Sequence, residues 1–292
     1  MKSLVLGGGG AFGSFEAGFL YTIFDKIEFD KIYGTSVGGL NAVLMAQAYL
    51  NGNPEIIKNL WTNLVSKNSD IYKKNYLALI TMRSPLSFSP LRKIIKDKIN
   101  IKEILKMEKQ IFLTSCDMIS GNSITFSNQN GLSEKEFVDA LIASASVPPL
   151  FPPVEIKNHV LVDGGVRDNV PLMSVINNPE LDSILVILCR DKQIPAKNEN
   201  YKSILRISER VVDVMMNEIT KNDLSGVLQV NKMLKEIKEK NGWLSDKSHI
   251  NIDVVSPGKN LEGECLKFDQ AVLQQNFAKG VQKGHEYLEK LN

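Results

Sequence analysis

Short apolar runs alternate with segments of helical periodicity along most of the chain. Continuous apolar runs bounded by turn residues are typical of buried strands, and they occur at Ser3–Leu6, Ile32–Tyr33, Gln110–Met118, Asn122–Ser127, Asp182–Arg190 and His249–Pro257. Helical patterns cover Gly13–Lys26, Leu40–Leu50, Ser133–Ser144, 202–240 and 268–291. This alternation predicts an α/β fold, a three-layer α/β/α sandwich with a mostly parallel central sheet.

The segment Asn53–Met107 is helical but less regular. Pro85 and Pro90 are expected to break it, because a proline inside a helix removes a donor and clashes with the preceding turn. No repeat or linker divides the chain. We therefore expect a single domain over residues 1–292, with a motif-bearing part over about 3–190 and a helical part over about 200–292 packed on it.

Composition adds few constraints on partners. The 292 residues are 43% hydrophobic, enough for a substantial core, and the formal net charge of +2 gives no reason to expect nucleic acid. Cys116, Cys189 and Cys265 are widely spaced, so we expect buried free thiols instead of disulfides or a zinc site. No residues show metal-ligand spacing, and neither a metal nor a cofactor is expected. The oligomeric state is not predicted.

The N-terminus bears on location. Only Leu4–Leu6 precede the first glycines, which is too short for a secretory segment or a membrane span. The expected location is the cytoplasm, with peripheral membrane contact and export without a cleavable signal left open.

The stretch GTSVGG places Ser36 between Gly34 and Gly38, directly after a predicted strand and before a helix. This is the pattern of a nucleophile elbow, a sharp turn that lifts the serine Oγ out of the backbone. The flanking glycines are needed because a Cβ would collide with the tight turn. The alternative interpretation of Ser36 is an ordinary helix N-cap.

The first loop, GGGGAFG, contains G-x-G-x-x-G at Gly8, Gly10 and Gly13. A dinucleotide-binding fold also requires an acidic residue about twenty positions further on, which would hold the ribose. Asp30, somewhat early, is the only candidate, and the serine turn occupies the expected region. The alternative use of such a loop is an oxyanion hole built from backbone N–H groups.

A serine nucleophile needs a base. Asp163 ends a short apolar run and begins the triplet DGG, which on its own signals a turn. His159 and His285 have the surroundings of surface residues, whereas His249 could complete a Ser-Asp-His order of the α/β-hydrolase kind. Three hypotheses remain open: a Ser-Asp dyad, a Ser-Asp-His esterase, and a non-catalytic nucleotide- or anion-binding protein that uses the glycine loop.

The ordered set GGGGAFG, GTSVGG, SASVPPLFPPV, DGG and VRDNVPL resembles the patatin-like phospholipases over about residues 3–190. The resemblance implies an α/β/α sandwich that hydrolyses acyl esters of phospholipids and other lipids, using a Ser-Asp dyad without histidine. Ser36 would be the nucleophile and Asp163 the base. The resemblance assigns the oxyanion loop to Gly8, Gly9, Gly10 and Gly13, and support of the elbow and the aspartate loop to Gly34, Gly38, Gly164, Gly165 and Asn169, with Pro171 shaping the latter loop.

One position departs from the family pattern. Phe12 stands where the family usually has Arg or Lys, and a charged donor is worth about twice a neutral one toward an oxyanion or a lipid phosphate. The other role considered for Phe12 is to line an acyl groove.

A lid and the acyl groove are expected in Asn53–Met107, around YLALITM and PLSFSPL. The basic residues beside them could meet an anionic bilayer, so a lipid substrate and transient membrane contact are expected; the alternative is a solvated helix face. These residues are Arg92, Lys93, Lys96, Lys98, Lys102 and Lys106.

Overall fold

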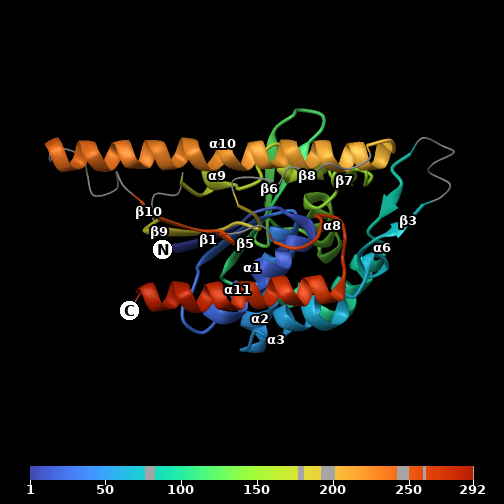
Figure 1. The fold of residues 1–292 in the computed structure, drawn as a ribbon, viewed down its shortest axis with the longest axis horizontal. Helices are drawn as coiled ribbons and strands as arrows, with labels where there is room; N and C mark the ends of the chain where they lie inside the picture. The colour runs from blue at the N-terminus through green and yellow to red at the C-terminus, as the bar shows by residue number, and fades with distance from the viewer. Residues whose placement is uncertain (76–82, 177–180, 192–200, 242–249, 259–260, 292) are drawn as a thin grey trace.

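The computed structural model describes residues 1–75, 83–176, 181–191, 201–241, 250–258 and 261–291. Within them a mostly parallel sheet lies between two layers of helices (Figure 1), which confirms the predicted α/β sandwich. The strands of the central sheet are β1 (Lys2–Leu6), β2 (Lys31–Thr35), β5 (Gln110–Asp117), β6 (Ser123–Ser127), β7 (Val154–Ile156), β8 (His159–Asp163), β9 (Ser183–Ile187) and β10 (Asn251–Val255).

The sheet has the order β10-β9-β1-β2-β5-β8-β7, and β6 pairs with β5. The first four contacts in this order are parallel, whereas β6, β7 and β8 pair antiparallel. The apolar run of β1 is central, with Leu4, Val5 and Leu6 fully buried. The six predicted runs each overlap a strand, and β8 covers the short apolar run that ends at Asp163, while β7 was not predicted from the sequence.

The helical layers differ in length and packing. Those on one face are α9 (Leu172–Ile176) and α10 (Ile204–Asn241), and those on the other include α1 (Gly13–Ile23), α2 (Val37–Asn51) and α11 (Gln270–Leu291) (Figure 1). Helices α1 and α11 approach each other closely because glycines face the partner backbone. A Cβ on Gly18 would lie 2.0 Å from the Phe277 carbonyl oxygen, and one on Gly280 would lie 2.0 Å from that of Phe15.

The segment 53–107 forms short pieces at one end of the sheet. They are α3 (Glu55–Asn59), a π-helical turn (Leu60–Leu64), α4 (Asn68–Ile71), the two-stranded pair β3 (Lys73–Lys74) and β4 (Leu86–Ser87), α6 (Ser89–Lys98) and α7 (Ile101–Ile104). The expectation that Pro90 interrupts the helical segment is confirmed, because α6 begins at Ser89 and Pro90 lies in its first turn. A proline is tolerated there since its missing N–H would have no intrahelical acceptor.

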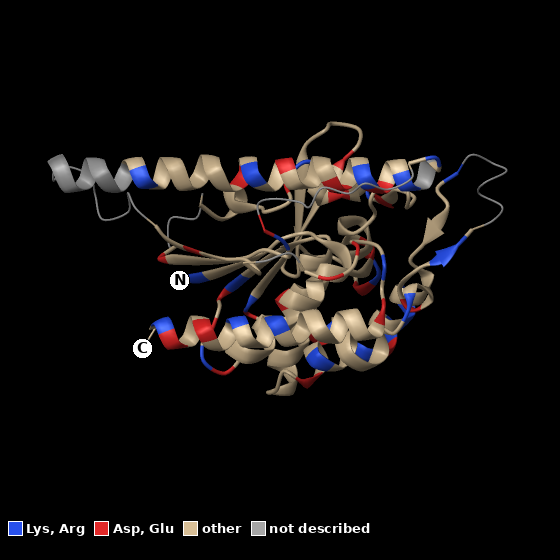
Figure 2. Ribbon diagram, viewed as in Figure 1, with Lys and Arg blue, Asp and Glu red and all other residues tan. Residues whose placement is uncertain are grey.

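Two further features are the start of α8 (Glu134–Ser144) and the distribution of charge on the long helices. Helix α8 begins with a capping box, in which the Ser133 and Glu136 side chains each accept from the other's backbone N–H. Acidic and basic residues are interspersed along α10 and α11 (Figure 2). None of the helices described here combines the length and apolar character needed to cross a membrane.

Candidate active site

Ser36 occupies a strained turn between β2 and α2. Its backbone dihedrals are φ 56° and ψ −124°, a conformation that side-chain-bearing residues rarely adopt and that is typical of a nucleophile elbow. The glycines on either side are required by packing, because a Cβ on Gly34 would lie 2.3 Å from the Gly38 carbonyl oxygen and one on Gly38 would lie 2.2 Å from that of Leu6.

The strained turn is held by a serine that the sequence did not indicate. The Ser36 backbone N–H donates to Ser144 Oγ at 2.9 Å, and this hydroxyl in turn donates to the Thr114 carbonyl oxygen at 2.6 Å. Ser144 is the last residue of α8 and is fully buried. The Ser144 side chain at the end of α8 therefore links the backbone of the elbow to strand β5.

The register of β5 explains how Asp163 reaches Ser36. Strand β2 pairs with β5 as far as Thr35 opposite Thr114, and β8 pairs with it from Asp163 opposite Ser115. Because β6 pairs with residues 112–116 of β5 and so occupies one edge, β2 and β8 share the other. The ends of β2 and β8 thus meet head to head, which brings together two side chains that are far apart in sequence.

Asp163 is fully buried. Its Oδ1 accepts a hydrogen bond of 2.7 Å from the Gly165 N–H, while its Oδ2 has no hydrogen-bond partner of good geometry among the described residues. Burial raises the pKa of Asp163 to about 7, and the Ser36 side chain and the Gly165 N–H act in the opposite direction. The carboxyl is thus near its titration point at neutral pH, next to a serine whose exposed fraction is 6%.

The glycine loop lies beside Ser36 and is tied to distant parts of the chain. A Cβ on Gly8 would lie 3.2 Å from Ser36 Cβ, so the loop backbone approaches the elbow directly. The Gly8 N–H donates to the Asn169 carbonyl oxygen at 3.2 Å, and the Ala11 N–H donates to that of Cys265 at 2.7 Å. These bonds fix both ends of the loop.

The amides of the loop are not all available to a ligand. The Gly13 N–H donates within its own turn, to the carbonyl oxygens of Gly10 and Ala11, and the Gly8 N–H is engaged as described. For the amides of Gly9 and Gly10, no hydrogen bond is found within the described parts of the chain. These two N–H groups are the candidates for binding a negatively charged oxygen.

Asn169 connects the aspartate loop to the glycine loop. Its Nδ2 donates to Thr220 Oγ1 of α10 at 2.7 Å and to the Gly8 carbonyl oxygen at 3.4 Å, and its backbone N–H donates to Asp223 at 3.0 Å. A Cβ on Gly165 would lie 2.6 Å from Asn169 Oδ1, so the glycine at this position allows the contact.

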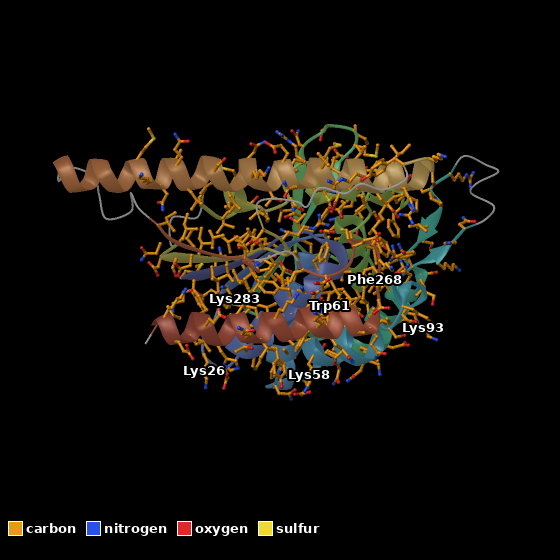
Figure 3. The ribbon with its side chains drawn as sticks, in the orientation of Figure 1. Lys26, Lys58, Trp61, Lys93, Phe268 and Lys283 are labelled. Carbon is orange, nitrogen blue, oxygen red and sulfur yellow. The ribbon has the colours of Figure 1, made fainter. Side chains whose placement is uncertain are left out.

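A cavity begins at Gly8, Gly9, Gly10 and Ser36 and continues between apolar side chains. Its apolar lining includes Trp61 and Phe268, both labelled in Figure 3, together with Tyr72, Phe88 and Leu91. The PLSFSPL stretch thus reaches the cavity, as expected for an acyl groove, while YLALITM (residues 76–82) lies outside the described residues.

The proposed role of Phe12 as a groove residue is wrong. Phe12 is not among the described residues that line the cavity; its ring is 8% exposed and packs in the core. The Cζ of Arg190 lies 4.5 Å from the ring centroid.

Comparison with known proteins decides the family. The family model described as Patatin-like phospholipase matches residues 4–176, which is more than half of the chain. The chain belongs to the patatin-like phospholipase family. A solved structure with detectable similarity is that of VipD from Legionella pneumophila, at 13% identity and a TM-score of 0.45, covering 99% of this chain and 67% of that one. Membership of the patatin-like phospholipases implies hydrolysis of acyl esters of lipids, with lipid substrates.

Three of the four residues considered for the alternative hypotheses are described, and they lie away from the glycine loop and Asp163. Asp30 precedes β2 and lies opposite Lys2, at the end of the sheet remote from the glycine loop, so it cannot hold a ribose there. His159 begins β8, roughly 13 Å along the strand from Asp163, and approaches Asp117 at 3.5 Å. His285 is exposed on α11, and His249 lies outside the described residues.

The patatin-like core is completed by residues that the motifs did not indicate. Helix α10 contributes Asp213, Met216 and Asn217 to the cavity lining, although its sequence predicted only a long helix.

Cys189 and Cys265 are free; Cys189 is buried as expected, whereas Cys265 is half-buried. Both pack on the glycine loop, with Cys189 Cβ 2.4 Å from the site of a Cβ on Gly9. Cys116 is buried and free as expected.

Proposed function

We propose that this patatin-like phospholipase hydrolyses lipid acyl esters with Ser36 as nucleophile and Asp163 as its only side-chain base. The observation that supports this most directly is a fully buried carboxyl, with its pKa raised to about 7, beside a serine held in a strained elbow. An ordinary aspartate with a pKa near 4 would be too weak a base at neutral pH, whereas burial increases its proton affinity.

In the first half of the reaction, Ser36 Oγ attacks the ester carbonyl carbon and its proton passes to Asp163. The tetrahedral intermediate carries a negative oxygen, which the N–H groups of Gly9 and Gly10 stabilise. Collapse of the intermediate breaks the ester C–O bond, and the departing alcohol takes the proton from Asp163. Water then attacks the acyl-serine in the same way, giving a free fatty acid and regenerating Ser36.

Covalent labelling tests this proposal. A fluorophosphonate probe forms an Oγ–P bond with release of fluoride, and we expect it to label the wild-type chain on Ser36 and to leave Ser36→Ala unlabelled. Asp163→Asn should reduce the labelling rate and hydrolysis of 4-nitrophenyl butyrate by at least a hundredfold. His159→Ala and His249→Ala should retain both activities. Equal labelling of wild type and Ser36→Ala would refute the proposal, and loss of activity in His249→Ala would favour a Ser-Asp-His triad.

We further propose that α6 contacts the membrane that supplies the substrate. Leu91 of this helix lines the cavity, while its Lys93, Lys96 and Lys98 are exposed. A membrane touching this helix would lie next to the apolar part of the cavity. Each lysine near an anionic surface contributes about 1 kcal/mol of attraction.

Vesicle binding separates this contact from general attraction between charges. Changing the three α6 lysines to glutamine should weaken sedimentation with phosphatidylglycerol vesicles, with no effect on phosphatidylcholine vesicles. The matched control changes Lys26, Lys58 and Lys283 to glutamine; these lie away from Lys93 in Figure 3 and alter the net charge equally. If both triple variants lose binding to the same extent, α6 is not the contact.

A further inference from the structure

Position 12 is where this chain departs from the family pattern, and the structure places a different cation there. Arg190 lies three residues beyond β9, which runs parallel to β1 with Ile187 opposite Leu6. The residues that follow the two strands therefore emerge side by side. Cys189 packs against Gly9, and Arg190 follows with its guanidinium over the Phe12 ring.

Arg190 is held in this position by Asp213, by the Phe12 ring and by the Cys265 side chain. Its guanidinium forms an ion pair with Asp213 of α10 and stacks at 4.5 Å on Phe12. Asp213 is shared with Arg210, whose Nη1 lies 3.3 Å away. Asp213 thus positions the Arg190 guanidinium at the end of the glycine loop.

The guanidinium also has hydrogen-bonding capacity to spare. Arg190 lines the same cavity as Gly9, Gly10 and Ser36, and its Nε is buried with no hydrogen-bond partner in the described part of the chain. The neighbouring Asp191 is turned away, since its carboxylate accepts from the Ser256 hydroxyl at 2.7 Å and from the Gly258 N–H at 3.1 Å. A negatively charged oxygen at the glycine loop would thus find Arg190 as a donor.

We infer that Arg190 supplies, from the end of β9, the positive charge that Phe12 fails to supply from within the glycine loop, and that it binds an anionic oxygen of the substrate. This inference rests on the proposed acyl hydrolase function. Phe12 serves as the aromatic platform that orients the guanidinium, because a flat cation stacks favourably on an aromatic face. The anionic oxygen belongs either to the tetrahedral intermediate or to the phosphodiester of a phospholipid, and two substrates distinguish these sources.

The experiment compares Arg190→Gln, Arg190→Lys and the double variant Phe12→Arg/Arg190→Gln. We expect Arg190→Gln to lower kcat/KM by about a hundred- to a thousandfold, since removal of one donor to a developing oxyanion has an effect on that scale. Arg190→Lys should lose less, and the double variant should recover at least tenfold because it restores a cation at the family's position. A fall in kcat with 4-nitrophenyl butyrate, which lacks phosphate, identifies the oxyanion; a rise in KM confined to dioleoylphosphatidylcholine identifies the phosphodiester.

The matched control is Lys109→Gln. Lys109 also pairs with a carboxylate, Glu28, and lies over an aromatic ring, Tyr49 at 4.8 Å, but it precedes β5 at the opposite end of the sheet. The Lys109→Gln change should leave both activities unchanged.

The inference is overturned if Arg190→Gln matches wild type on both substrates. It is also overturned if all three Arg190 variants lose activity and melting temperature together, with no rescue by the Phe12→Arg change. Because fluorophosphonate labelling of the wild type tests Ser36 separately, a labelled wild type with a fully active Arg190→Gln rejects this inference and leaves the proposed function standing.

Discussion

Replacing Asp163 by asparagine should make the protein more stable at alkaline pH while removing its proposed base. Burial raises the pKa of this carboxyl from 3.8 to about 7. The unfolded chain therefore loses the proton before the native state does, and the native state binds more protons between these two values. The contribution of Asp163 to the free energy of unfolding is therefore greatest below pH 4 and is lost as the pH rises to 7.

The magnitude follows from the width of this window. Each pH unit in which only the unfolded carboxyl is ionised lowers the free energy of unfolding by about 1.4 kcal/mol. The whole window corresponds to about 4 kcal/mol, and the part above pH 5 to about 3 kcal/mol. Asp163→Asn does not titrate, so it should escape this loss.

Urea unfolding of wild type and Asp163→Asn at pH 5 and pH 8.5 measures the effect. On going to the higher pH, the wild type should lose about 3 kcal/mol more than the variant. Glu16, whose pKa burial raises to about 8, is present in both proteins, so its contribution cancels. If the two proteins change stability in parallel within 1 kcal/mol, Asp163 is not a buried carboxyl with a raised pKa, and the reasoning fails.

Three further results are expected. The rate at which a fluorophosphonate labels Ser36 should rise with pH around a midpoint near 7, whereas a flat profile above pH 5 would show a base with an ordinary pKa. Ser36→Gly should be about 1 kcal/mol more stable than Ser36→Ala in urea unfolding, because glycine relieves the strain at φ 56°; equal stability would show that the elbow is unstrained. Gly38→Ala should cost more than about 2 kcal/mol, because its Cβ would lie 2.2 Å from the Leu6 carbonyl oxygen. Gly226→Ala, in open space on α10, should instead gain about 1 kcal/mol, and similar effects of the two changes would contradict the packing argument.

The parts of the fold that could be predicted are those specified by local sequence. The run Leu4–Leu6 is buried on both faces of a parallel sheet, so it reads as an uninterrupted apolar strand. Gly34 and Gly38 could be predicted to flank the turn, because the close contacts around Ser36 leave no room for a Cβ at either position. The elements of the segment 53–107 were harder to predict, because they are short and their boundaries depend on packing against the rest of the molecule.

The geometry of the candidate site was predictable only in part. The order of the motifs suggested that Ser36 and Asp163 belong together, but their meeting depends on β2 and β8 sharing one edge of β5. No sequence motif indicates the role of Ser144, because this role depends on a hydrogen bond from a backbone N–H 108 residues away in sequence. The raised pKa of Asp163 likewise depends on burial by the whole fold.

The glycine loop shows why a motif identifies a site without defining its donors. Its glycines leave the backbone without side chains, but contacts with the second half of the chain decide which amides are already engaged. Gly8 is engaged by Asn169 and Ala11 by Cys265, and this leaves Gly9 and Gly10 as the available N–H groups. Arg190 reaches the loop from the end of β9 and is held there by Asp213 of α10. The departure at Phe12, which in the sequence suggested a weakened oxyanion site, thus corresponds in the fold to a cation delivered from another strand.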